Sequence, residues 1–104
     1  MNTRLNFNRN WGLGTSSTLI NNIANWFDVD AFKLLKSTFG GSGYDIAAAQ
    51  NEQAITYQLT QNGPSVLKSN FHPDYSDNIF FVYLNEKKNS RDAIEHYKAL
   101  PETN

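Results

Sequence analysis

Cysteine is absent from the 104-residue chain. Its absence excludes disulfide bonds, a thiolate nucleophile and a cysteine-ligated zinc site. No apolar run approaches the roughly 20 residues of a membrane-spanning helix, and the first residues lack the apolar stretch of a secretory signal. The chain also lacks a basic stripe, because its net charge is −1 and its lysines and arginines are scattered. We therefore expect a cytoplasmic protein whose partners include neither nucleic acid nor a membrane.

Apolar side chains, in contrast, are sufficient for a packed core. Hydrophobic residues make up 39% of the chain and aromatic residues 13%, which favours a folded domain over disorder. Their spacing predicts elements in the order β-α-α-(α)-β-β-β-α, and thus an α+β fold. The predicted elements are a strand at 4–11, helices at 16–27 and 31–38, a short helix within 42–50, a hairpin of 54–59 with 65–71, a strand at 78–84 and a helix at 90–100.

Polar residues and glycines mark the predicted helix ends. Asp28 or Asp30 is suited to cap the second helix, and Gly40 with Gly41 to end it, because glycine adopts the left-handed conformation without penalty. Ser90 is the expected N-cap of the last helix. The first and last helices should each bury one face, made respectively of Leu19, Ile20, Ile23, Ala24 and Phe27, and of Ala93, Ile94, Tyr97 and Leu100.

Both ends of the sequence lie close to predicted elements. The first predicted strand begins almost directly after the first residues, and Pro101 is expected to stop the last helix with no further predicted element after it. We expect the chain to be a fragment of a longer protein. Apolar surface should then remain exposed on the 78–84 strand or on the 90–100 helix, where missing elements would pack.

The stretch NWGLGTSSTLINN, residues 10–22, places two glycines and a run of hydroxyl side chains before an amphipathic helix. The first turn of a helix leaves about four backbone N–H groups unpaired and carries partial positive charge. Glycines let the backbone approach an anion, and hydroxyls bind phosphate oxygens or a metal ion. The stretch is therefore a candidate phosphate cradle, although it is neither a Walker A motif nor a dinucleotide fingerprint. The alternative is a tight turn at Gly12 and Gly14, followed by a helix that Ser16 or Ser17 caps.

A second candidate is the stretch GGSGYD, residues 40–45. A carboxylate on a glycine-rich turn can accept the proton of a substrate hydroxyl as that oxygen attacks a phosphorus atom. Asp45 is thus a candidate base. The alternative is a helix end at the glycines, followed by Asp45 as the cap of the next short helix.

Taken together, the two stretches resemble the GHMP small-molecule kinases, named for galactokinase, homoserine kinase, mevalonate kinase and phosphomevalonate kinase. The stretch GLGTSS resembles the family's phosphate loop, and GSGYD resembles the aspartate segment of its mevalonate-kinase-like branch. The run GYDIA is similar to the signature of a bacterial subgroup. The resemblance covers about residues 3–100.

The resemblance implies a two-layer GHMP-type fold that binds ATP and Mg²⁺. It also implies an ATP-dependent kinase that transfers the γ-phosphoryl group to a hydroxyl or phosphate of a small metabolite. Asp45 is implied as the catalytic residue and Ser16 as a Mg²⁺ ligand. The implied nucleotide contacts are Gly12, Leu13, Gly14, Thr15, Ser16 and Ser17. Residues 1–53 would belong to the N-terminal kinase domain, and residues 54–104 would begin the C-terminal domain.

The sequence departs from the family in several ways. The family often carries a Mg²⁺-binding glutamate in its second helix, but residues 31–39 contain no carboxylate. The family's first motif and its third, glycine-rich motif are also missing, so the fragment by itself is expected to be inactive. A non-catalytic module that binds a nucleotide or phosphate therefore stays an alternative, as does a structural α+β domain.

Overall fold

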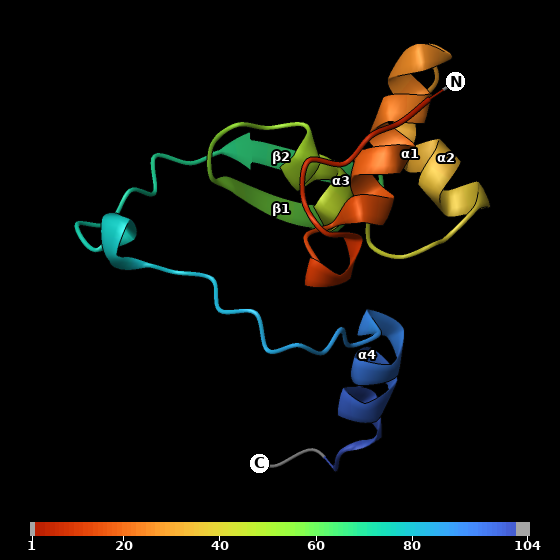
Figure 1. Cartoon of the computed structure of the whole chain (residues 1–104). Helices are drawn as coiled ribbons and strands as arrows, with labels where there is room; N and C mark the ends of the chain where they lie inside the picture. The colour runs from red at the N-terminus through yellow and green to blue at the C-terminus, as the bar shows by residue number, and fades with distance from the viewer. Residues whose placement is uncertain (1, 102–104) are drawn as a thin grey trace. The chain divides into compact units, whose positions relative to one another are not determined.

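The computed structural model describes residues 2–101 and divides the chain into two units. One unit is Gly14–Ile79, and the other combines the described residues up to Leu13 with those from Phe80 onward. Within residues 2–101 there are four α-helices and one two-stranded antiparallel sheet, so the predicted α+β class is confirmed (Figure 1). None of the helices in this range has the length and apolar character needed to cross a bilayer.

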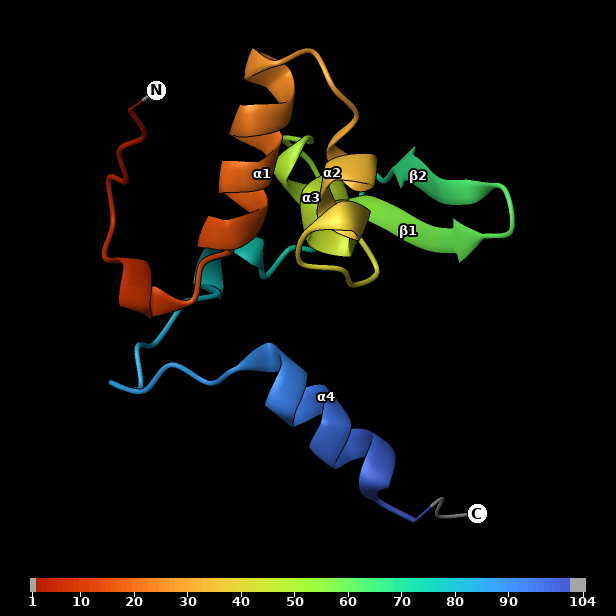
Figure 2. The same ribbon diagram turned by 90° about the vertical axis from the view of Figure 1, so that its right-hand side faces the viewer.

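The larger unit consists of three helices and a hairpin. The helices lie side by side, and the hairpin extends away from them (Figures 1 and 2). The helices are α1 (Thr15–Trp26), α2 (Ala31–Ser37) and α3 (Tyr44–Ala49), the strands are β1 (Ile55–Thr60) and β2 (Gly63–Lys68), and a 3₁₀ helix η2 (Ser76–Asn78) follows. All three helices and the hairpin were predicted, with bounds that differ by a few residues at most.

The core of this unit is small and forms where the three helices meet. Its buried residues are Ile20, Ala24, Ala31 and Ile46, and Phe32, Leu34 and Leu35 pack against them. The two alanines allow the helix backbones to approach one another closely, because they carry only a methyl group. The predicted face of α1 is buried only in part, since Leu19 and Phe27 are exposed.

The connections between the helices follow the polar and glycine signals of the sequence. Asp30 is the N-cap of α2, and its Oδ1 accepts a hydrogen bond from the Lys33 N–H at 2.9 Å. Asp28, the other predicted cap, instead lies in the α1–α2 connection with a φ of 52°. Gly40 has a φ of 67° and its N–H donates to the Leu35 carbonyl, so the predicted glycine stop after α2 is confirmed.

Two predicted strands are wrong. Residues 4–11 contain the 3₁₀ helix η1 (Arg9–Trp11), because the Asn8 side chain and carbonyl accept hydrogen bonds from the N–H groups of Asn10 and Trp11. Residues 78–84 form no strand either. Their apolar sequence favours an extended backbone, but no strand within residues 2–101 pairs with it, and a strand requires a partner.

The last helix, α4 (Ser90–Ala99), lies in the smaller unit and is present as predicted. Its N-cap is Asn89 rather than Ser90, since the Asn89 side chain accepts a hydrogen bond from the Arg91 N–H. The prediction of a buried face is wrong, because all four of its apolar residues (Ala93, Ile94, Tyr97 and Leu100) are exposed. In the same unit, the rings of Trp11 and Tyr83 lie 6.5 Å apart at a tilted angle.

Candidate functional site

The start of α1 carries three backbone N–H groups with no acceptor. Gly14 is the N-cap residue in the left-handed conformation, and no side chain caps the helix. The first hydrogen bond in the helix joins the Thr18 N–H to the Gly14 carbonyl at 3.1 Å. Within residues 2–101, the N–H groups of Thr15, Ser16 and Ser17 therefore have no partner. The alternative in which Ser16 or Ser17 caps the helix is wrong, because both residues lie inside its first turn.

The charge at this helix end is not offset by its own side chains. The first turn of α1 contains no acidic residue, whereas α3 has Asp45 and α4 has Asp92 in the same position. The partial positive charge of the α1 dipole therefore faces solvent without a carboxylate from its own first turn. Ser16 is exposed, while Thr15 and Ser17 are half-buried.

The predicted loop is shared between the two units. Gly12 is left-handed with a φ of 74° and, with Leu13, belongs to the smaller unit. Gly14, Thr15, Ser16 and Ser17 belong to the larger one. The structure thus brings together the last four of the six predicted nucleotide contacts at one helix end.

Asp45 lies in the first turn of α3, where it is exposed. The N-cap of α3 is Gly43, so Asp45 does not cap this helix as the alternative supposed. Gly43 has a φ of 84°, and a Cβ atom there would lie 2.9 Å from Phe32 Cδ1 and 3.2 Å from the Tyr57 hydroxyl. Glycine at this position therefore lets the chain turn into α3 directly against α2 and β1.

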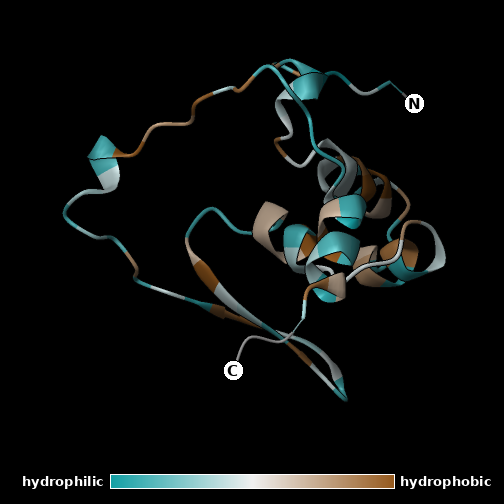
Figure 3. Ribbon diagram, turned by 90° about the horizontal axis from the view of Figure 1, so that it is seen from below, coloured by the Kyte–Doolittle hydropathy of each residue, from teal (hydrophilic) through white to brown (hydrophobic). Residues whose placement is uncertain are grey.

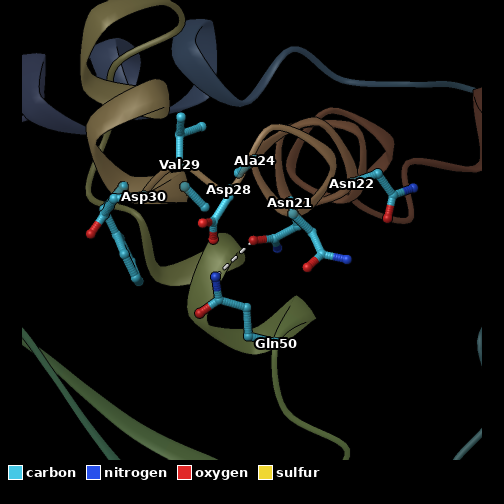
Figure 4. A pocket seen from close by; sticks show the side chains of 10 residues that line it. Asn21, Asn22, Ala24, Asp28, Val29, Asp30 and Gln50 are labelled. Carbon is cyan, nitrogen blue, oxygen red and sulfur yellow. Dashed lines mark hydrogen bonds between the residues drawn. The ribbon is translucent and has the colours of Figure 1, made fainter. Parts of the chain in front are cut away.

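Asn21 connects α1 to α3 through both ends of its amide. Its Nδ2 donates to the Ile46 carbonyl at 3.1 Å, and its Oδ1 accepts from Gln50 Nε2 at 2.8 Å (Figure 4). Asp45 directly precedes Ile46, and Ser16 lies five residues before Asn21 in the same helix, or about 7.5 Å along its axis. The helices that carry the two predicted motifs therefore pack against each other.

A pocket of about 510 Å³ lies at the other half of α1. Asn21, Asp28 and Gln50 point toward its interior (Figure 4). Its remaining lining residues are Asn22, Ala24, Asn25, Val29, Asp30, Ala31 and Phe32. The lining contains no lysine, arginine or histidine, so the pocket suits a neutral or cationic polar molecule better than a phosphate.

Sequence reasoning missed this pocket, and it contains none of the predicted site residues. The asparagines at 21, 22 and 25 were a usable signal, because they interrupt the apolar residues of an amphipathic helix. The positive φ of Asp28 could not be predicted from the sequence.

Ser16 is the predicted metal ligand. Among residues 2–101, no group of three or more histidine, cysteine, aspartate or glutamate side chains is placed to hold a metal ion. Ser16 offers one hydroxyl oxygen, which fits Mg²⁺ only together with phosphate oxygens and water.

Comparison with known proteins gives no relative. The chain matches no protein-family model, no curated protein and no solved structure.

Proposed function

We propose that the start of α1 binds the phosphates of a nucleotide, and that the chain acts in a small-molecule kinase of the GHMP type. The observation that carries the proposal is the set of three unpaired N–H groups at Thr15–Ser17, which follow a left-handed glycine and face no carboxylate from their own turn. Such a helix end favours anions through both its donors and its dipole.

The reaction assigned to this site is phosphoryl transfer from ATP. The hydroxyl oxygen of a small metabolite attacks the γ-phosphorus, the bond from that phosphorus to the β,γ-bridging oxygen breaks, and ADP leaves. Asp45 takes the proton of the attacking hydroxyl, and the N–H groups of the first α1 turn hold the phosphates. Mg²⁺ held by Ser16 and the phosphates would neutralise part of their charge.

The second candidate is a module that binds a nucleotide without catalysis. It is favoured by the lack of any carboxylate in residues 31–39, where the kinase family often has its metal-binding glutamate. Both candidates require the same phosphate contacts at α1. They differ in the role of Asp45.

The shared step is tested by placing a carboxylate in the first turn of α1. Ser16→Asp should stabilise the helix by about 0.3–1 kcal/mol, because a negative charge at this end complements the dipole. The same charge should abolish binding of ADP, measured by isothermal titration calorimetry with and without Mg²⁺. Ser16→Asn is the matched control, since it introduces a polar side chain of similar size without charge and should keep most of the affinity.

Opposite changes in stability and affinity separate this proposal from simple misfolding. Wild-type protein that binds neither ADP nor pyrophosphate would refute both candidates. Unchanged ADP affinity in Ser16→Asp would show that the phosphates do not bind at the start of α1.

A further inference from the structure

The residues Phe80–Leu84, here called the 80–84 segment, expose an uninterrupted apolar stretch. The exposed fractions are 79% for Phe80, 94% for Phe81, 77% for Val82, 45% for Tyr83 and 80% for Leu84. Figure 3 draws this part of the ribbon, which follows η2, mostly in the colour of hydrophobic residues. Such a stretch is costly to leave in water, because hydrating apolar surface raises the free energy.

The backbone of the 80–84 segment is also unpaired. Within residues 2–101, none of its N–H or C=O groups makes a hydrogen bond. Its residues are aromatic, β-branched or aliphatic, with no charge and no proline. This combination favours pairing with another strand, which satisfies the backbone and buries the side chains at once.

We propose that the occupant is a second copy of this chain, paired antiparallel through the 80–84 segment. The charges that flank the segment favour this occupant and this orientation. Asp74 and Asp77 precede the segment, whereas Glu86, Lys87 and Lys88 follow it with a net charge of +1 (−1 and two times +1). Antiparallel pairing brings the acidic end of one copy to the basic end of the other, whereas parallel pairing places like charges together.

Pairing Val82 with itself matches Phe80 with Leu84 and Phe81 with Tyr83, so these residues all gain apolar partners. Asp77 lies in η2 and Asn85 has a left-handed φ of 59°, so Asp77 and Lys87 lie outside the paired strand. Their charges attract each other across the two ends of the pair and favour the antiparallel orientation. Lys88 is already held by Glu86 at 2.7 Å, so Lys87 is the better partner for Asp77.

The expected dimer is weak and reversible. Two short strands bury much less than the ~800 Å² per partner of a stable interface. The protein should therefore shift from monomer to dimer as its concentration rises. This proposal does not depend on phosphate binding at α1.

The apolar part is tested by sedimentation velocity over a concentration series of the full chain. Phe81→Lys places a charge in the middle of the paired segment and should leave a monomer at all concentrations. Phe71→Lys is the matched control, because Phe71 is similarly exposed, at 67%, but lies outside the segment. It should dimerise like wild type, and far-ultraviolet circular dichroism should show that both variants keep their helices.

The orientation is tested by charge reversal. Asp77→Lys and Lys87→Asp should each raise the dimer dissociation constant roughly 10-fold, since each variant faces like charges at both ends of the pair. The double variant should return to the wild-type value. A mixture of the two single variants should form heterodimers in preference to either homodimer.

Several results would overturn the proposal. If the wild-type chain is a monomer at every concentration, the 80–84 segment does not pair with a second copy. Equal loss of dimer in Phe71→Lys would place the contact elsewhere. No rescue in the double variant would refute the antiparallel arrangement, and growth into fibrils that bind thioflavin T would show open-ended stacking in place of a dimer.

Discussion

Among the described glycines, Gly43 is the one whose missing side chain decides the packing. The other left-handed glycines have open space where a Cβ atom would lie, but at Gly43 that space is taken by Phe32 and Tyr57. Residue 43 must therefore adopt a left-handed backbone conformation and must also leave room for Phe32 and Tyr57.

Gly43→Ala should destabilise the protein by about 2–4 kcal/mol. Roughly 1 kcal/mol or more comes from the left-handed backbone, and a further ~1–3 kcal/mol from the overpacked methyl group. Urea denaturation followed by circular dichroism measures the loss. Gly40→Ala is the control, because its φ of 67° carries the backbone cost without any close contact. Equal losses in the two variants would contradict the packing argument.

Asp45→Asn separates the catalytic role from the helix-dipole role of this carboxylate. Loss of the charge in the first turn of α3 should cost about 0.3–1 kcal/mol of stability, whereas Glu52→Gln, outside any helix, should cost close to nothing. In the intact protein, the kinase proposal predicts that kcat for phosphoryl transfer falls ~10²-fold. The Michaelis constant for ATP should hardly change, because the lost interaction belongs to the transition state. Full turnover in Asp45→Asn would remove Asp45 from the mechanism.

At the scale of elements, Asn21 joins two helices by hydrogen bonds from one side chain. Asn21→Ala removes both bonds and should cost about 1–2 kcal/mol, measured from the urea midpoint. Asn22→Ala is the matched control in the next position. Its side chain makes no hydrogen bond within residues 2–101, so the change should stay within about 0.5 kcal/mol. A similar loss in both variants would contradict a special role for the two Asn21 bonds, since alanine by itself favours a helix more than asparagine does.

The helices and the hairpin could be predicted because their signals are local. Apolar spacing, the Asp30 cap and the Gly40 stop each act within a few residues, so α1 and α2 were predicted within one residue of their bounds. The strands predicted at 4–11 and 78–84 are wrong, since alternating or apolar residues show only a preference for extended backbone. Whether a strand forms depends on a partner that is distant in the sequence.

In the candidate site, too, the local features could be predicted, whereas the contacts between distant residues could not. The position of Thr15–Ser17 at a helix start follows from the order of glycines and hydroxyls, and it was predicted. The contact of Asn21 with Gln50 joins residues that are far apart in the chain, and the pocket beside them depends on how three helices pack. The asparagines of α1 indicate a polar stretch of that helix, but no pattern in the sequence shows which residues of the other helices meet it.

At the scale of the whole molecule, the buried residues of the described range 2–101 all belong to Gly14–Ile79. The residues of the smaller unit are nearly all exposed, including those of α4. The backbone amides of the larger unit should therefore exchange with solvent more slowly than those of the smaller unit.

Hydrogen–deuterium exchange should be slowest in α1 and α3, which surround Ile20 and Ile46. Residues 80–89 should exchange almost as fast as an unfolded chain in dilute solution, because they make no backbone hydrogen bond to the core. Mass spectrometry of peptic peptides gives both rates in one experiment. Raising the protein concentration should slow exchange in residues 80–84 if the chain dimerises there. Strong protection of α4 in dilute solution would contradict the division into a buried and an exposed unit.

Tyr57 has a consequence for the order of folding. Its hydroxyl donates to the Ser42 carbonyl, and its ring meets Tyr44 edge-on at 6.5 Å, so one side chain of β1 holds the hairpin to the start of α3. The hairpin and the helices can each form from contacts of their own, and the Tyr57 contacts require both to be in place. Tyr57→Phe should therefore accelerate unfolding while leaving the refolding rate nearly unchanged, the behaviour of a contact that forms after the rate-limiting barrier.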